Sequence, residues 1–198
     1  MRKFSPTVTR AAITRGFLLA GLLLVCAAGI THAAEWRLDL AGSKLEYTAT
    51  LQKTRASGIF KEFEMRARFD ESRLADSRAD VTVVVASADM IDAEVNKAIR
   101  EVDWLDSARF PQAEFHTSDI RRVGENSYLA RGALTVKGVE QQIEVPFVWT
   151  NEADAATITG ELTVKRAAFR IGLGEWASTD VVGPDVTVKF RVRLRRTG

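Results

Sequence analysis

The chain has 198 residues, of which 28 are lysine or arginine and 26 aspartate or glutamate, so the formal net charge is +2. This near balance gives no electrostatic reason to expect a nucleic-acid partner, which requires a marked excess of basic residues. One cysteine, Cys26, and two histidines, His32 and His116, leave few ligands for a transition metal. We therefore expect neither a metal site nor a cofactor.

Residues 1–33 have the pattern of a secretory signal peptide. The first 15 residues carry four basic and no acidic side chains, residues 16–25 form a short apolar run, and small residues follow up to Ala33. The run is shorter than the ~20 residues that span a bilayer. Cleavage after Ala33 would remove Cys26 and His32 and change the net charge to −2, with 24 basic and 26 acidic residues remaining. We expect an exported, periplasmic protein; an uncleaved anchor and lipid attachment at Cys26 are the alternatives.

The rest of the chain alternates apolar and polar residues with a period of two, as half-buried strands do. The alternation is clearest near the C-terminus, where Val188, Phe190 and Val192 are separated by Lys189 and Arg191. A strand places these two sets on opposite faces, one dry and one charged. The same pattern predicts eight strands, over residues 44–52, 57–69, 79–88, 111–121, 127–137, 140–150, 156–166 and 185–195.

Eight long antiparallel strands with one apolar face close most economically as a barrel, because closure removes the exposed edges. Residues 34–198 are therefore expected to form one all-β domain. A short edge strand is predicted at 36–40. The apolar parity changes within 57–69, which predicts a bulge or sharp bend near Lys61 and Glu62. Hairpin turns are predicted at residues 123–126, 137–138 and 151–154.

Two connections are too long for tight turns. The one between the third and fourth strands has apolar residues at helical spacing, which predicts a short helix over residues 92–102. Those apolar residues are Ile91, Val95, Ile99 and Val102. The other connection runs from 167 to 184. Both are expected to cover a mouth of the barrel.

The inward face combines small residues in the middle of strands with aromatic residues. An eight-stranded barrel is either filled by its own side chains or holds one small ligand, and the pattern leaves both interpretations open. The wall residues expected to contact a ligand are Tyr47, Phe60, Val83, Phe115, Tyr128, Leu134, Phe147, Trp149, Leu162 and Phe190. The residues expected to gate the mouth are Trp104, Phe110, Phe169 and Trp176.

No catalytic residue is predicted, and we expect a binding protein rather than an enzyme. His116 falls on the polar face of its strand, and Asp92 and Asp103 belong to carboxylate pairs beside the helix, where capping is the commoner role. An enzyme acting on a lipid-like substrate is one alternative, with Asp103, Glu175 and His116 as the residues to test. An eight-stranded outer-membrane barrel is another, because alternation does not say which face is inside.

Four ordered motifs resemble the YceI-like family. Residues 58–63 (GIFKEF) resemble its G-x-F-x-x-F segment. Residues 103–115, with DWLD and FPQAEF, are similar to its stretch of an Asp-aromatic pair followed by F-P-x-x-x-F. Residues 128–139 (YLARGALTVKGV) resemble its Y-x-A-x-G-x-L-T hairpin. Residues 166–176 (RAAFRIGLGEW) resemble the G-x-G-E-W loop of one subgroup.

The resemblance implies a lipocalin-like eight-stranded barrel, secreted or periplasmic, whose long apolar cavity binds an isoprenoid or quinone-type lipid. The subgroup with the G-E-W loop also occurs joined to membrane b-type cytochromes, which implies such a cytochrome as a partner. The chain departs from the subgroup at Ala168, where Asp is common, at Arg170, where Gly is common, and near Gln52, where many members have His. No head-group contact is therefore carried over. Arg166 and Arg170 are expected in surface salt bridges, with contact to a phosphate head group as the alternative. The oligomeric state, a homodimer included, stays open.

Overall fold

The computed structural model describes residues 34–197, which belong to one compact unit. The predicted signal peptide, residues 1–33, lies outside the described residues. The strands are β1 (Ala34–Leu51), β2 (Thr54–Phe60), β3 (Phe63–Phe69), β4 (Arg78–Val84), β5 (Ala88–Asp89), β6 (Gln112–Arg122), β7 (Ser127–Val136), β8 (Val139–Glu152), β9 (Ala155–Lys165) and β10 (Val182–Arg196). The helices are α1 (Ala93–Ala98) and the single 3-10 turns η1 (Leu74–Asp76), η2 (Val85–Ser87), η3 (Arg166–Phe169) and η4 (Gly174–Trp176).

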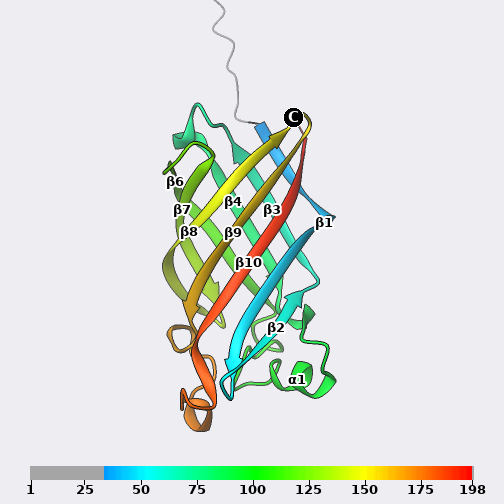
Figure 1. The fold of residues 1–198 in the computed structure, drawn as a ribbon, viewed down its shortest axis with the longest axis vertical. Coiled ribbons are helices and arrows are strands. Elements are labelled where there is room, and N and C mark those ends of the chain that lie inside the picture. Colours follow the sequence, from blue (N-terminus) through cyan, green and yellow to red (C-terminus); the bar gives the residue numbers. More distant parts are fainter. Residues whose placement is uncertain (1–33, 198) are drawn as a thin grey trace, which may run out of the picture. The chain divides into compact units, whose positions relative to one another are not determined.

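Eight of the strands close into an antiparallel barrel, which confirms the predicted fold class (Figure 1). Neighbours follow the order β1, β3, β4, β6, β7, β8, β9 and β10, and β10 pairs back onto β1 along most of its length. The short strands β2 and β5 lie outside this ring, β2 on the C-terminal half of β1 and β5 on the end of β2. Closure leaves no full-length edge strand exposed.

The predicted edge strand 36–40 and the first predicted strand 44–52 are one long strand, β1, so the prediction of a separate edge strand was wrong. β1 pairs with β3 on one side and β10 on the other, with a register irregularity between Asp39 and Lys44. Ser43 satisfies the backbone there: its hydroxyl donates to the Asp39 carbonyl oxygen at 2.7 Å and accepts from Arg193 N at 2.8 Å. The irregularity therefore bends the strand without ending it.

The predicted bend near Lys61 and Glu62 is present and separates β2 from β3. Lys61 N donates to the Ser87 carbonyl oxygen at 3.2 Å, and Glu62 N donates to Ser87 Oγ at 3.1 Å. This contact explains why the predicted strand 79–88 is interrupted. The chain turns at η2 after Val84, and Ser87 reaches the bend instead of continuing the ladder.

Strands β6 to β10 follow one another as neighbours, and the structure places their bounds close to the prediction. The β7–β8 turn consists of Lys137 and Gly138, with φ of 51° and 71°, the left-handed conformation that a two-residue hairpin turn requires. The β8–β9 turn is shorter than predicted. Strand β8 extends to Glu152, which pairs with Ala155, so that only two residues connect the strands.

The apolar face of the sheet is inside the barrel and the charged face is outside. On β10, Val188 and Val192 point inward, whereas Arg195 binds Asp39 of β1 on the outer face, with 2.8 Å between Nη2 and Oδ2. On β7 and β8, Arg131 and Glu144 form a similar outer pair at 3.0 Å. An outer-membrane barrel requires the reverse orientation, because its apolar band faces outward and its interior is polar.

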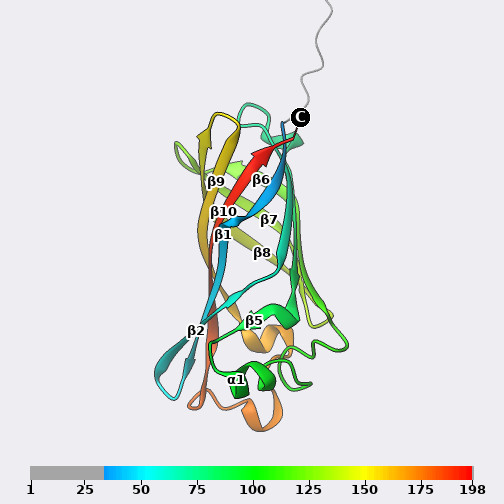
Figure 2. The same cartoon turned by 90° about the vertical axis from the view of Figure 1, so that its right-hand side faces the viewer.

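The two ends of the barrel differ (Figures 1 and 2). At one end, the closed end, lie the start of β1, the end of β10 and the β6–β7 and β8–β9 turns. At the other, the mouth end, lie the β1–β2 hairpin, α1, the β7–β8 turn and the β9–β10 connection. The six-residue α1 is the only α-helix among residues 34–197, where no helix is both long and apolar enough to cross a bilayer.

Aromatic side chains fill the closed end. Trp36 and Trp149 meet edge to face with ring centroids 5.2 Å apart, and Phe69 meets Tyr128 in the same way at 5.2 Å. Tyr128 and Leu194 have no exposed surface. The barrel is therefore a packed core at this end.

Candidate ligand-binding cavity

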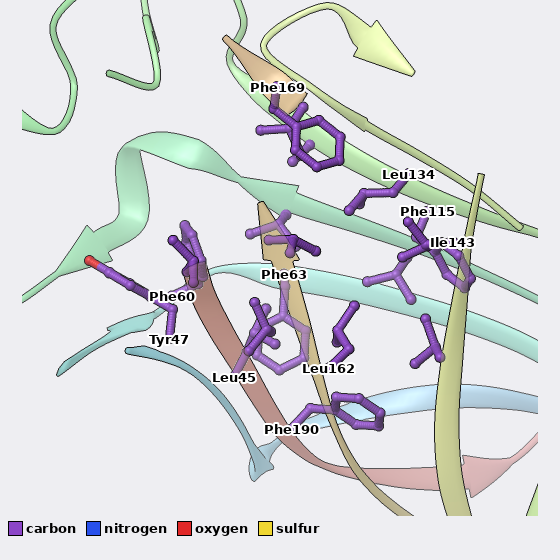
Figure 3. A pocket seen from close by; sticks show the side chains of 18 of the residues that line it. Leu45, Tyr47, Phe60, Phe63, Phe115, Leu134, Ile143, Leu162, Phe169 and Phe190 are labelled. Carbon is purple, nitrogen blue, oxygen red and sulfur yellow. The ribbon is translucent and has the colours of Figure 1, made fainter. Parts of the chain in front are cut away.

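Between the closed-end core and the mouth lies a cavity of about 530 Å³. Every strand of the barrel contributes inward side chains to it, and nearly all of these are apolar. Figure 3 shows Phe115, Leu162 and Phe190, from β6, β9 and β10, converging on this space. The volume lies within the range of about 300–1,000 Å³ that is usual for small-molecule sites.

The interior is thus packed at one end and hollow toward the other, which resolves the alternative that the sequence leaves open. Leu45, Met65, Val83 and Phe190 point inward but are only half-buried, because their side chains border the cavity. The small residues Ala49 and Ala113 also line the cavity wall and leave it wide.

Twelve of the fourteen residues that the sequence singles out line this cavity. They are Tyr47, Phe60, Val83, Trp104, Phe115, Leu134, Phe147, Trp149, Leu162, Phe169, Trp176 and Phe190. The structure therefore brings these twelve residues together around one cavity.

The other two, Tyr128 and Phe110, do not line the cavity. Tyr128 shares the inward face of β7 with Leu134 but sits at the closed end, where its ring stacks on Phe147 with 5.4 Å between centroids. Phe110 lies outside the mouth, over the β7–β8 turn. Its Cε1 atom is 2.6 Å from where a Cβ atom of Gly138 would be. Phe110 lines a second, more open hollow beside the mouth, the outer hollow.

The helix closes part of the mouth but is shorter than predicted. Asp92 caps α1 as expected, accepting from Glu94 N at 2.9 Å and Val95 N at 3.1 Å. After Ala98 the chain leaves the helix in tight turns, which direct Trp104 and Leu105 into the cavity. Of the residues at helical spacing, Val95 and Ile99 line the cavity, whereas Ile91 and Val102 are exposed.

The β9–β10 connection covers another part of the mouth. Trp176 meets Trp104 with 5.4 Å between ring centroids, and Phe169 is buried beside them. Gly172 N donates to the Asp103 carbonyl oxygen at 2.8 Å, which ties the two connections together. Gly172 has a φ of 61°, and a Cβ atom there would lie 3.3 Å from the Trp104 ring.

Arg166 holds this connection in place from inside the barrel. It is only 3% exposed, so the expectation of a surface salt bridge was wrong for this residue. Its five N–H groups donate to the carbonyl oxygens of Ile171, Gly172, Trp176, Val182 and Gly183, four of them at 2.8 to 3.0 Å. A guanidinium has five donors. All are therefore used by the backbone, and none is left for a ligand.

Tyr47 stands at the cavity wall near the mouth, with its ring 4.9 Å from that of Phe60. Its hydroxyl oxygen is buried and has no hydrogen-bond partner. Burial and the nearby negative charge of Asp89 raise the pKa of the Tyr47 hydroxyl to about 12. Figure 3 shows the hydroxyl directed away from Leu162 and Phe190.

A model of the family described as the YceI-like domain matches residues 36–194, from β1 to β10. The chain belongs to the YceI-like family. It is 31% identical over 176 residues to Protein YceI of Salmonella newport, covering 85% of this chain and 88% of that protein. The crystal structure of Burkholderia cenocepacia BcnA is similar with a TM-score of 0.77 and 35% identity, covering 79% of this chain and 98% of that one. A polyisoprenoid-binding domain from Saccharophagus degradans, 16% identical over 84% of this chain and 99% of its own, shares the fold with a TM-score of 0.67.

In this YceI-like protein, the residues considered for catalysis are not brought together. His116 lies on the outer face, with Nδ1 2.8 Å from Asp80 Oδ1 and Nε2 3.6 Å from Glu114 Oε2. The hydrogen bond with Asp80 is the main cause that raises the pKa of His116, and the Glu114 carboxylate adds to it. Asp103 lines the outer hollow and Glu175 is exposed. No group of His, Cys, Asp and Glu residues within 34–197 is arranged to hold a metal ion. The cavity offers an apolar volume rather than acid–base chemistry.

Proposed function

We propose that this YceI-like protein is a periplasmic carrier that holds the tail of an isoprenoid or quinone-type lipid in its barrel cavity. The observation that carries the proposal is the cavity itself, walled by apolar side chains from all eight barrel strands. Each CH₂ group removed from water contributes about 0.8 kcal/mol. A long apolar tail therefore needs no charged contact in order to bind.

Two further observations support the proposal. The Saccharophagus degradans domain with the same fold is described as binding polyisoprenoids. The pattern of residues 1–33 favours export, because it combines a basic start, a short apolar run and a small-residue cleavage site. The likeness of the 166–176 loop to a subgroup joined to b-type cytochromes favours a quinone-type tail, with such a cytochrome as the exchange partner.

The geometry indicates how the lipid would be oriented. Because side chains pack the closed end, the tail enters from the mouth and extends toward Phe147 and Trp149. The head group then stays near Trp104 and Trp176 at the mouth. Arg166 does not bind the head group directly, since its donors are all used.

Quenching of tryptophan fluorescence by a short-tailed isoprenoid quinone tests the proposal, because Trp104, Trp149 and Trp176 line the cavity. We expect saturable quenching at one quinone per chain. Val188→Phe, which adds a ring inside the cavity, should weaken binding at least about tenfold. Thr187→Phe, on the outer face of the same strand, is the matched control and should bind like the unaltered protein. Quenching that never saturates, or that both variants share equally, would contradict a cavity site.

A further inference from the structure

Exposed apolar side chains gather at the mouth end of the barrel. Of the eight large hydrophobic residues that are exposed among residues 34–197, five lie at this end, four of them on connections and one at the end of β1. These five, the mouth rim, are Leu51, Ile91, Val102, Leu173 and Val181. Single exposed hydrophobic residues are ordinary, but a group of them at one place marks an interaction surface.

Backbone contacts join the segments that carry four of the rim residues, Leu51 with Val181 and Val102 with Leu173. Leu51 ends β1 at the hairpin, and the next residue, Gln52, donates from its N–H to the Val181 carbonyl oxygen at 2.8 Å. Val102 and Leu173 line the same outer hollow, where the bond from Gly172 N to the Asp103 carbonyl oxygen joins their two connections. The rim is therefore built from three connections that the fold ties together.

Ile91 is the most exposed residue of the rim, at 96%. It has a φ of 69°, a left-handed conformation that β-branched residues rarely adopt. Asp89 holds it there: Oδ1 accepts from Ile91 N at 2.9 Å and from Asn96 Nδ2 at 2.7 Å. A strained backbone that presents a whole apolar side chain to the outside is typical of a functional contact.

Cationic side chains stand in the hollow between Val102 and Leu173. Arg109, Lys137 and Arg170 line it, together with the carboxylates Asp103 and Asp106. Arg170 is exposed, makes no ion pair with a residue of the described chain, and adopts the left-handed conformation with φ of 56°. Lys137 Nζ donates to the Arg170 carbonyl oxygen at 2.9 Å. One positive charge is left in excess beside apolar side chains, an arrangement that suits phosphate groups lying above acyl chains.

We propose that the mouth rim is a membrane-docking surface, which sets the opening of the cavity against the head-group region of a phospholipid bilayer. This docking proposal rests on the proposed carrier function. A lipid tail that left the cavity away from a bilayer would have to cross water, and docking at the mouth avoids that step. A bilayer is favoured over a protein partner because the apolar rim lies at the mouth end of an apolar cavity and has cations beside it. Docking itself needs no cargo.

Flotation with vesicles of phosphatidylethanolamine and phosphatidylglycerol, free of isoprenoid lipids, tests the docking. The protein used is residues 34–198, which contain the whole closed barrel and its core. The variant Ile91→Glu/Leu173→Glu should bind at least about tenfold more weakly. The matched control is Val123→Glu/Val148→Glu, which adds the same charge at exposed positions that do not belong to the mouth connections, and it should bind within about twofold of the unaltered protein.

The outcomes separate docking from cargo binding. The rim variant should bind the quinone as well as the unaltered protein does, while extracting it from vesicles at least about tenfold more slowly. Vesicles of phosphatidylcholine alone should bind more weakly, because they offer no net negative charge to the hollow. If the unaltered protein does not float, or if the two Glu variants bind equally, the docking proposal is overturned, whatever the quinone titration shows.

Discussion

Tyr47 on β1 lies directly opposite Gly58 on β2, and its hydroxyl oxygen is 2.6 Å from where a Cβ atom of residue 58 would be. The glycine makes room for the ring, which then packs against Phe60 at the cavity wall. A side chain at position 58 would have to displace the tyrosine from the mouth of the barrel.

Replacing Gly58 by Ala is therefore expected to destabilise the fold. The new Cβ atom would also meet the Asp89 carbonyl oxygen, 2.7 Å away, which belongs to the backbone and has little freedom to move. Overpacking of this kind costs about 1–3 kcal/mol in the free energy of unfolding, measured with urea. Gly124→Ala is the control, because the nearest atom there is Ser127 Cβ at 3.2 Å. Equal losses in the two variants would show that the contact with Tyr47 is not restrictive.

The Tyr47 hydroxyl should make stability fall at high pH. In the unfolded chain tyrosine ionises near pH 10, whereas in the fold the pKa of Tyr47 is about 12, so the folded state binds more protons between these values. The free energy of unfolding therefore decreases as the pH rises from about 10 to about 12. Tyr47→Phe should remove this part of the decrease and leave stability at neutral pH equal or slightly higher, since the hydroxyl has no partner. If the unfolding free energies of the unaltered protein and Tyr47→Phe fell in parallel between pH 10 and 12, the decrease could not be assigned to the Tyr47 hydroxyl.

Loss of Arg166 should loosen the mouth. Arg166→Met leaves buried carbonyl oxygens of the β9–β10 connection without donors, and each such group costs about 1–3 kcal/mol unless water reaches it. We expect a loss of at least about 3 kcal/mol in unfolding free energy and faster hydrogen exchange across residues 169–183. Arg170→Ala removes an exposed arginine four residues away and should change stability by no more than about 0.5 kcal/mol. Unchanged exchange in Arg166→Met would mean that the arginine does not hold the connection.

His116 should affect pH-dependent stability but not lipid binding. Its pKa is raised from 6.5, mainly by the hydrogen bond with Asp80, so the folded state favours the protonated ring. The resulting stabilisation is complete below the unfolded pKa and is lost as the pH rises through the higher folded pKa. His116→Gln should abolish this dependence in urea unfolding while leaving quinone affinity unchanged. A loss of affinity would point to a role in the cavity that its place on the outer face does not explain.

The alternation of residues predicted which side chains face inward, but not how deep along the barrel each one lies. Leu134 and Tyr128 share a face of β7, yet only Leu134 reaches the cavity. Depth depends on the register of each strand against its neighbours, and the positions of distant turns set that register. No local sequence pattern therefore indicates that Tyr128 lies outside the cavity.

Arg166 and Ile91 show a second limit of what the sequence can predict. A buried arginine without a carboxylate is unexpected from sequence, because its five acceptors are backbone carbonyls of the β9–β10 connection and the start of β10, and side-chain types do not reveal how that backbone folds around the guanidinium. Ile91 fits a helical spacing with Val95, yet it precedes the helix and points outward. The helix begins only at Ala93, after the Asp92 cap, and capping rather than periodicity sets that start.

The most direct test of the carrier proposal is native mass spectrometry of residues 34–198 purified after export, with extraction of any bound lipid. The proposal predicts one lipid per chain, with an isoprenoid tail, and its loss from Val188→Phe but not from Thr187→Phe. A protein that carries no lipid and takes up none when isoprenoid quinone is supplied would contradict it.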